Sequence, residues 1–571
     1  MTPKFMRSDR HRLGRAVAGF VVSALVGAAL VIANPAPANA SARTLVVPSQ
    51  FRTISAAVTA AHNGDTILVS PGTYHENITV DHKYLILKAR SSDPSRTTII
   101  GKPGRTPVMI AHVPARQGLP RASLIGFHIT GGSAHSGQGG AITVAFHADA
   151  IIRNNLIERN HSDHGGGILV WDHSNPTIAS NTIRKNTVTL FGGGVYAAMQ
   201  SSPRIWGNVI TGNRCVGGVT RGGGPAGGAI FITNDPFHPR VPRSHPTIER
   251  NSIVGNSAEF AGGGIMLASY TDAKVSLNRI SGNRSSYGGG IHIENHGASP
   301  VLSNNTIYGN VATRSAKYSG SGSGGGISVF GASRPLIGHN SIYQNTASYA
   351  GGGLVLAENS TSKLNGNKIF ANTVDPGIPG SCGGGVAIAQ AAARLTNNVI
   401  RNNRGPIGGG VSALGTGRVD LVNNVIVANT ATQGGTAAGG GVYIGAKPAG
   451  SVSVSNNIVS ENNDYQIFEH GAIADYYNNI VTNSDRGIYF SYPAHTINTI
   501  SRFNGNPYVH AAGGNLSQAP SFYNASAGNF SLQAGSTGID AGRRYGAPPV
   551  DLVGHLRPAG GGVDIGAYEL G

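Results

Sequence analysis

The fold is decided by the stretch PTIASNTIRKN (residues 176–186), which is followed after a short loop by GGGV (residues 192–195). The same pattern, P-x-I-x-x-N-x-I-x-x-N, then a variable loop and a Gly run before an aliphatic residue, recurs from residue 139 to residue 445. Its leading Asn falls at 155, 181, 208, 251, 278, 305, 340, 367, 398, 424 and 457, and a second Asn follows five residues later each time. The Gly runs begin at 139, 165, 192, 227, 262, 288, 324, 351, 383, 408 and 439, with spacings of 25 to 36 residues.

Apolar residues alternate with other residues after each Gly run, as in Ile291-His292-Ile293. A period of two is typical of β-strands with one buried face and excludes helices here. Strands this short can bury Ile and Val only when each repeat stacks on the repeats before and after it. The eleven Gly runs therefore predict an all-β solenoid, a parallel β-helix with eleven coils.

The repeated Asn and Gly residues are interpreted as structural. Asn tolerates left-handed backbone at a corner, and stacked Asn side chains can hydrogen-bond from coil to coil. The Gly runs open strands and are not followed by Lys-Ser/Thr, so we interpret them as backbone corners and not as phosphate-binding loops.

The first forty residues have the pattern of an export signal, with five basic residues, an uncharged apolar run from Ala16 to Ala33, and Ala38-Asn39-Ala40. Cleavage after Ala40 is expected, and an uncleaved N-terminal anchor is the alternative, because the apolar run is long enough to cross a bilayer. We divide the chain into a signal peptide (1–40), an N-terminal cap with the first coils (41–125), β-helix repeats (126–510) and a C-terminal capping segment (511–571). A secreted, extracellular monomer is expected.

The chain is basic, with a formal charge of +17 that falls to +13 without the first forty residues. Such a surface favours acidic polymers. No nucleic-acid-binding motif accompanies the charge, so an acidic polysaccharide is the expected partner and nucleic acid is not.

The chain has two cysteines, Cys215 and Cys382. Their coils are five apart, which corresponds to roughly 24 Å, whereas a disulfide needs Cα atoms within about 7 Å. We predict that the two residues are not bonded to each other.

The repeats resemble those of the pectin-lyase-like superfamily of right-handed parallel β-helix proteins, over most of the mature chain. The segment from Thr53 to Glu76 also resembles the opening of many such proteins, including NosD-like periplasmic ones, in which it forms a capping helix and the first strands. Ile54, Val58 and Ala61 would share one face of that helix and cover the open end of the apolar core.

The C-terminal segment from Gly514 to Glu569 resembles the choice-of-anchor Q segment of bacterial surface β-helix proteins. No hydrophobic or LPxTG-like anchor follows Glu569, so release into the medium is favoured over attachment. Asp540, Asp551 and Asp564 are interpreted as turn residues of a C-terminal cap, and binding of a cation is the alternative.

Residues at one offset after each Gly run lie above one another, about 4.8 Å apart per coil, so side-chain columns can be read from the sequence. Polar and aromatic residues gather at the strand ends from Trp171 to Glu358, whereas coils after residue 385 offer mainly Ala, Ser and Gly. Carbohydrate sites combine acid/base carboxylates with aromatic platforms. We therefore predict the catalytic candidates Asp172, Asp235, Asp272 and Glu294, and the substrate-binding candidates Trp171, His173, Tyr196, Tyr270, His292, His296, Arg240 and Arg243.

Within this band, Tyr196 and His292 are expected to face outward, and Trp171 and Tyr270 are expected to stack on sugar rings. The insertions at 215–226, 235–245 and 313–323 are expected to wall the same face. A solvated face without any function is the alternative for each single Asp or His.

A metal site is a further hypothesis, based on two adjacent coils that carry His161, Asp163, His164, Asp172 and His173. Their spacing matches no zinc or EF-hand signature. The resemblance to pectate lyases implies a Ca²⁺-binding Asp cluster and an Arg or Lys base, but no such motif is matched, so calcium stays open. Another column, formed by Arg204, Lys274 and Lys363, is interpreted as a solvated face.

The resemblance implies a lyase, hydrolase or epimerase that acts on an extracellular polysaccharide. The alternative is a non-enzymatic adhesin or structural solenoid, because the Gly and Asn repeats also resemble those of adhesin-type β-helices. A concave, loop-walled cleft around the carboxylates would favour the enzyme, and a flat, evenly decorated solenoid would favour the adhesin.

Overall fold

The computed structural model describes residues 42–134, 139–217, 224–234, 242–295, 297–433, 438–445, 448–471, 473–482, 484–491, 495–507 and 509–570. They divide into an N-terminal unit (up to residue 225) and a C-terminal unit (from residue 226), which are described separately. The expected export signal at 1–40 lies outside the described residues. Among the described helices, none has the length and apolar character needed to cross a membrane.

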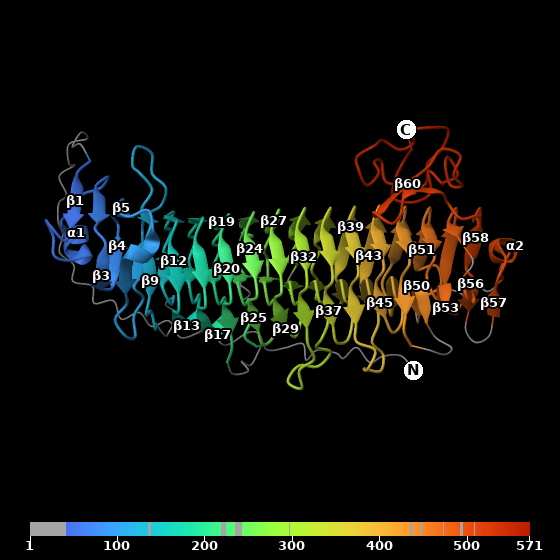
Figure 1. Cartoon of the computed structure of the whole chain (residues 1–571), viewed down its shortest axis with the longest axis horizontal. Helices are drawn as coiled ribbons and strands as arrows, with labels where there is room; N and C mark the ends of the chain where they lie inside the picture. Colours follow the sequence, from blue (N-terminus) through green and yellow to red (C-terminus); the bar gives the residue numbers. More distant parts are fainter. Residues whose placement is uncertain are drawn as a thin grey trace. The chain divides into compact units, whose positions relative to one another are not determined.

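The strands of the N-terminal unit form parallel ladders at four positions of the coil, which we call stacks A to D (Figure 1). Stack A contains β1 (Thr44–Val47), β2 (Thr66–Val69), β5 (Ile86–Ala89), β8 (Ser123–Ile125), β11 (Ile151–Arg153), β15 (Thr177–Ala179) and β19 (Arg204–Trp206). Stack B contains β3 (Gly72–His75), β6 (Thr97–Ile100), β9 (His128–Thr130), β12 (Leu156–Glu158), β16 (Thr182–Arg184) and β20 (Val209–Thr211). Stack C contains β4 (Ile78–Asp81), β7 (Val108–Ala111), β10 (Ile142–Ala145), β14 (Ile168–Val170) and β18 (Val195–Ala197), and stack D contains β13 (His161–His164), β17 (Thr187–Phe191) and β21 (Arg214–Cys215). A short 3₁₀ helix, η1 (Pro94–Arg96), precedes β6.

The C-terminal unit repeats the four stacks. Stack A contains β23 (Thr247–Glu249), β27 (Lys274–Ser276), β31 (Val301–Ser303), β35 (Leu336–Gly338), β39 (Thr361–Asn365), β43 (Ala392–Thr396), β47 (Val419–Val422), β51 (Val452–Ser455), β54 (Ala474–Tyr477) and β58 (Ala511–Gly513). Stack B contains β24 (Ser252–Val254), β28 (Arg279–Ser281), β32 (Thr306–Tyr308), β36 (Ser341–Tyr343), β40 (Lys368–Phe370), β44 (Val399–Arg401), β48 (Val425–Val427), β52 (Ile458–Ser460) and β55 (Ile480–Val481).

Stack C of the same unit contains β22 (Ile230–Ile232), β26 (Ile265–Ala268), β30 (Ile291–Glu294), β34 (Ile327–Val329), β38 (Leu354–Ala357), β42 (Val386–Ala389), β46 (Val411–Leu414), β50 (Gly439–Gly445), β53 (Tyr465–His470), β56 (Gly487–Ser491) and the antiparallel β57 (His495–Ile497). Stack D contains β25 (Ser257–Ala258), β29 (Arg284–Ser285), β33 (Val311–Ala312), β37 (Thr346–Ala347), β41 (Thr373–Val374), β45 (Arg404–Gly405) and β49 (Thr430–Ala431). Each of the eleven Gly runs leads into a strand of stack C, which confirms the predicted coils. Strands before and after them add coils that the Gly runs do not mark.

The predicted capping helix, α1 (Ile54–Ala60), follows β1 near the start of the N-terminal unit. Ile54, Val58 and Ala61 are buried, as the shared apolar face predicts. Thr53 caps the helix by accepting the backbone N–H of Ala56. The carboxylate of Glu76 accepts the N–H groups of Ile54 and Ser55, which satisfies two further donors at the helix start.

The two Asn columns form buried hydrogen-bonded ladders inside each unit. Asn278 donates from its backbone N–H and from Nδ2 to Oδ1 of Asn305, at 3.0 Å in both cases. Nδ2 of Asn278 also donates a hydrogen bond to the carbonyl oxygen of Ile248 in the preceding coil. Because every polar atom of this buried amide has a partner, the ladder stabilises the coil stack, and the structural interpretation of the Asn columns is confirmed.

The left-handed corner residue is the one before each ladder Asn, and not the Asn itself. Leu277, Asn304 and His339 have φ values of 58, 55 and 54, and each precedes an Asn of the first ladder. The sequence interpretation placed this conformation on the ladder Asn. The difference has a physical reason: the corner turns the chain so that the next side chain points inward and meets the Asn of the neighbouring coil.

The Gly runs are corners, as predicted, and they also permit close packing of backbones. Gly262 and Gly288 open their runs with φ values of 62 and 60. A Cβ atom on Gly264 would lie 2.6 Å from the carbonyl oxygen of Gly290 in the next coil. No side chain larger than hydrogen fits there.

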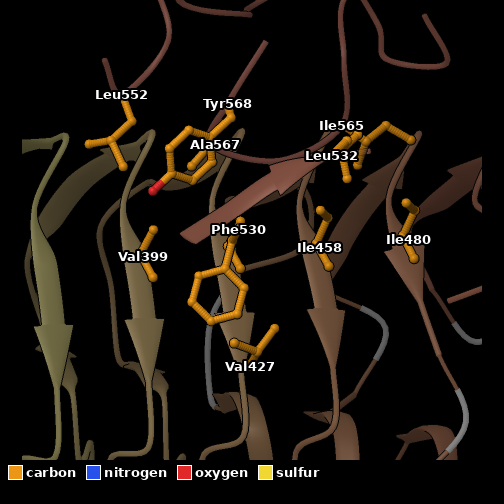
Figure 2. Packing of buried hydrophobic residues seen from close by; sticks show 11 residues of the cluster. Val399, Val427, Ile458, Ile480, Phe530, Leu532, Leu552, Ile565, Ala567 and Tyr568 are labelled. Carbon is orange, nitrogen blue, oxygen red and sulfur yellow. The ribbon is translucent and has the colours of Figure 1, made fainter. Parts of the chain in front are cut away.

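The C-terminal segment lies along the side of the last coils. Figure 2 shows Phe530, Leu532, Ile565 and Tyr568 facing Val399, Ile458 and Ile480. The segment includes the antiparallel pair β59 (Phe522–Asn524) and β60 (Asn529–Leu532). At the end of the coils, α2 (Ile500–Asn504) buries Phe503 against the rings of Tyr476 and Tyr489.

Two sequence predictions about side-chain pairing are also resolved by the structure. Cys215 and Cys382 are both buried and are not bonded to each other, as predicted. Asp551 accepts the N–H groups of Val553, Gly554 and His555, and Asp564 accepts those of Asp540 and Leu570. These carboxylates are therefore engaged as turn residues of the C-terminal segment.

Candidate functional site

Most polar residues of the predicted band lie in the turns that follow the strands of stack C. Asp172 and His173 follow β14, Tyr270 follows β26, and Glu358 follows β38. All four have left-handed backbone, with φ between 52 and 55. Asp and His tolerate this conformation better than most residues, so part of the band reflects the needs of the turn.

In the N-terminal unit, the band forms one exposed polar group and one buried aromatic group. The carboxylate of Asp172 lies 2.7 Å from Nδ1 of His173, and the ring of His147 stacks on His173 with centroids 4.8 Å apart. Tyr196 is 6% exposed and packs against the rings of His164 and Trp171. The expectation that Tyr196 faces solvent is wrong, because the chain before each Gly run folds over this position. Burial raises the pKa of Tyr196 above its usual value.

In the C-terminal unit, Asp272 and Arg243 form a bidentate ion pair. Nε of Arg243 lies 2.5 Å from Oδ2 of Asp272, and Nη2 lies 2.6 Å from Oδ1. Nη2 also donates to the carbonyl of Gly297. The two residues therefore bind each other, and both predicted roles, carboxylate catalysis and attraction of acidic chains, would require the pair to open.

Glu294 is the predicted carboxylate with the most developed surroundings. Its Oε2 lies 2.9 Å from Nε2 of His292, and Nδ1 of His292 lies 2.5 Å from Oγ of Ser328. His292 is 2% exposed and Ser328 is fully buried, whereas the side chain of Glu294 is 20% exposed. The expectation that His292 faces solvent is wrong. The imidazole connects a buried hydroxyl with a carboxylate at the surface.

Aromatic side chains surround this group. The ring of His292 lies 6.1 Å from Tyr287 and 5.5 Å from Phe330, measured between centroids. Burial, together with the charges of Glu294 and Glu358, raises the pKa of Tyr287 above its usual value. We call Tyr287, His292, Glu294, Ser328, Phe330 and Glu358 the Glu294 patch.

The predicted wall formed by the insertion at 313–323 is present beside this patch. The hydroxyl of Tyr287 donates to the carbonyl of Ser319. Tyr318 packs edge-on against Phe260 with centroids 4.9 Å apart, and Phe260 in turn packs against Tyr287. The insertion is thus tied to the patch through aromatic contacts.

Several sequence predictions cannot be placed. Asp235 and Arg240, which belong to residues 235–241, and also His296 lie outside the described residues. Conversely, Ser328 was not among the predicted residues although it follows its Gly run by the same offset as His292, four positions after Gly324 and Gly288. That offset would have identified it.

The hypothesised metal ligands do not form one group. His164 is half-buried and packs against Phe191 and Tyr196, and desolvation of its ring lowers its pKa to about 4. Asp163 accepts the hydroxyl of Thr189 at 2.7 Å. Asp172 and His173 instead combine with His147, and a second group of the same composition contains Asp81, His82 and His112.

Two other surface features lie away from the predicted carboxylates. Arg204, Lys274 and Lys363 are exposed, in agreement with a solvated face. A cavity of about 240 Å³ in the C-terminal unit is lined by His339, Asn340, Ser341, Gly366, Lys368, Leu552 and Val553. None of these residues belongs to the predicted band.

Comparisons with known proteins agree with the fold. The sequence profile described as "Right handed beta helix region" matches residues 126–241 and 313–447. No curated protein matches the chain significantly. Among solved structures, pectate lyase Pel9A aligns at 14% identity over 94% of this chain and 98% of that chain, with a TM-score of 0.29.

Two further solved structures show similar values. A mutant of the periplasmic alginate epimerase AlgG aligns at 14% identity over 68% of this chain and 75% of that chain, with a TM-score of 0.34. The catalytic domain of a GH87 alpha-1,3-glucanase aligns at 14% identity over 82% and 69% of the two chains, with a TM-score of 0.31. Values this low assign no activity to the chain. The profile match and the stacked parallel strands identify it as a right-handed parallel β-helix protein.

Proposed function

We propose that this protein is exported and binds an extracellular polysaccharide at the Glu294 patch, where it cleaves or modifies the sugar chain as a lyase, hydrolase or epimerase. The observation that carries the proposal is the hydrogen-bonded series from Ser328 through His292 to Glu294, which ends in a carboxylate at the surface. The export pattern of the first forty residues and the basic charge of the chain support an extracellular and acidic partner.

The hydrogen bonds favour one assignment of protons. If Oγ of Ser328 donates to Nδ1 of His292, then Nε2 carries the ring proton and donates to Oε2 of Glu294. Oε1 of Glu294 has no hydrogen-bond partner among the residues that the structure describes. This oxygen is thus available to take a proton from a sugar carbon or from water, the step that a lyase, an epimerase or a hydrolase requires.

His292 and Ser328 act as positioning residues in this proposal. Both are buried, so neither can contact a polysaccharide directly. They fix the orientation of Glu294, and the rings of Tyr287 and Phe330 pack against the ring of His292. Glu358 supplies a second carboxylate on the same patch.

The test is product analysis after incubation of the protein with a panel of acidic and neutral polysaccharides. Glu294→Gln should lower the rate on the best substrate by at least about 100-fold, because loss of a general acid or base typically costs that much. Glu249→Gln is the matched control, since Glu249 is a half-buried carboxylate of the same unit that pairs with Arg250. Equal rates for Glu294→Gln and wild type would refute the assignment.

The second candidate is a non-enzymatic adhesin or structural solenoid. The bidentate pair of Arg243 and Asp272 favours it, because a predicted catalytic carboxylate is already engaged by a cation. Binding of a polysaccharide without any change in its length or composition, unaffected by Glu294→Gln, would support this candidate.

A further inference from the structure

We propose that the N-terminal unit carries two binding sites for a divalent transition-metal ion such as Zn²⁺, Cu²⁺ or Ni²⁺. One site consists of Asp81, His82 and His112, and the other of His147, Asp172 and His173. We call them the Asp81 cluster and the Asp172 cluster. The inference does not depend on the function proposed for the Glu294 patch.

Both clusters lie in the same column of turns. The turns follow β4, β7, β10 and β14, four successive strands of stack C, and each turn contributes one His. Register places His82 beside His112, and His147 beside His173, so each cluster joins two neighbouring turns. The same ligand composition, two imidazoles and one carboxylate, thus occurs twice in this column, with the second cluster shifted by one residue along the turn.

The ligand atoms of the Asp81 cluster already converge. Oδ1 of Asp81 lies 2.7 Å from Nδ1 of His112 and 3.0 Å from Nδ1 of His82. The two imidazole rings are nearly parallel, with centroids 4.4 Å apart. One atom from each residue lies within 4.8 Å of the others, a spacing from which small side-chain rotations reach ligand distances of about 2.0–2.2 Å.

The Asp172 cluster has the same construction. Oδ1 of Asp172 lies 2.7 Å from Nδ1 of His173, and the ring of His147 stacks on that of His173 at 4.8 Å with an interplanar angle of 16°. Asp172 and His173 have left-handed backbone in the turn, which directs both side chains away from the coil.

The donor set selects the class of ion. Two imidazole nitrogens and one carboxylate oxygen, with water in the remaining position, suit borderline divalent ions such as Zn²⁺, Cu²⁺ and Ni²⁺. Ca²⁺ and Mg²⁺ prefer six or more oxygen ligands, which neither cluster supplies. The side chains of the Asp81 cluster are 44–70% exposed, so an ion can reach them without any movement of the coil.

The turn column also supplies an internal comparison. The next turn of the column, after β18, carries Met199 and Gln200 at the positions of Asp172 and His173. Neither Met199 nor Gln200 offers an imidazole or a carboxylate, so the ligand pattern ends there. The clusters are therefore a local feature of four turns and not a general property of the repeat.

The test uses the full protein without any histidine tag and measures Zn²⁺ binding by isothermal titration calorimetry. Wild type should bind two ions per chain. His112→Ala and His173→Ala should each bind one, and the double variant should bind none. Ca²⁺ should produce no heat at either cluster.

His161→Ala is the matched control, because His161 is an exposed imidazole of the same unit that belongs to neither cluster. It should still bind two ions. Zn²⁺ should also raise the thermal midpoint of wild type but not of the double variant, because an ion that binds only the folded state stabilises it. Absence of Zn²⁺ binding by wild type, or full binding by the double variant, would overturn the proposal, and loss of binding in only one single variant would overturn the other cluster.

Discussion

Stack B of the C-terminal unit has one exposed part and one covered part, although both are built from the same repeat. The first outward position of its strands reads Arg279, Thr306, Ser341 and Lys368 in β28 to β40, and the residues pair in register. In β44 to β55 the same position reads Val399, Val425, Ile458 and Ile480. The first four residues face solvent or are half-buried, whereas the last four are buried under the C-terminal segment (Figure 2).

The comparison distinguishes the residues that stabilise the coil from the residues that determine whether another segment covers it. Inward residues are alike in both parts, as Ile280 and Ile426 show, and the Asn ladders continue through both. The first outward position changes from polar to apolar. This position therefore distinguishes the free face from the face that is covered by another segment of the chain.

The largest expected effect comes from making the covered part like the exposed part. Val425→Lys would place an ammonium group in the hydrophobic cluster that also contains Ile565 and Phe530. We expect a loss of about 3–5 kcal/mol in the free energy of unfolding, the cost of an uncompensated buried charge. Chemical denaturation and limited proteolysis of the segment after residue 516 would measure it.

Thr306→Lys is the control for this change, since Thr306 occupies the same strand position in the exposed part, beside Arg279. It should change the stability by less than about 0.5 kcal/mol, as is usual for surface substitutions. Equal stability of both variants would show that docking of the C-terminal segment does not depend on the apolar residues at the first outward position of stack B.

This column was readable from the sequence, and so was most of the fold. The periods of Asn and Gly determine the coils, because each repeat must place the same side chain on the same ladder. The replacement of Lys368 by Val399 at one offset marks where the outer face becomes buried. This change predicts that some segment covers the outer face, but it does not predict which one. The contact between Val399 and the residues near 565 depends on the path of a long irregular segment.

The candidate site was less predictable because exposure does not follow from alternation alone. Tyr196 and His292 occupy outward positions of their strands, yet both are buried by the chain that leads into the Gly runs. The pairing of Asp272 with Arg243 depends on the conformation of an insertion, which repeats do not encode. By contrast, the offsets of the column correctly place Glu294 at the end of its strand and Asp172 and His173 in the turn after theirs, while their roles stay predictions.

The inward positions should be equally sensitive in both parts. Ile280→Ala and Ile426→Ala each remove a fully buried side chain from the centre of a stack B strand. We expect each to cost about 2–5 kcal/mol through lost burial and a residual cavity. Denaturation midpoints that differ strongly between the two variants would mean that the covering C-terminal segment also stabilises the core of the coils. In that case the stability of the coils would not be independent of the segment that covers them.

A rise in pH should lower the stability of the last coils of the C-terminal unit. Glu469 is fully buried and accepts the hydroxyls of Tyr476 and Tyr489, and burial raises its pKa to about 7. Because this folded pKa lies above the pKa of about 4.5 that an exposed Glu has, the stabilisation is complete below about pH 4.5 and is lost as the pH rises through about 7. The full loss is about 3 kcal/mol. Glu469→Gln, which cannot ionise, should flatten the dependence of the unfolding free energy on pH over this window, and an unchanged slope would contradict the assignment.

The smallest of these effects should come from the Asn ladder. In Asn278→Ala, the backbone N–H and Nδ2 of Asn251 lose the Oδ1 atom that accepts them, and Oδ1 of Asn305 loses the Nδ2 donor. The cost should be about 1–3 kcal/mol for buried polar groups left without partners. Asn424→Ala removes the equivalent bonds that Asn424 accepts from Asn398 and donates to Asn457 in the covered part, so it should cost a similar amount. Equilibrium denaturation of the two variants measures both values, and a negligible loss in either part would show that water replaces the ladder there.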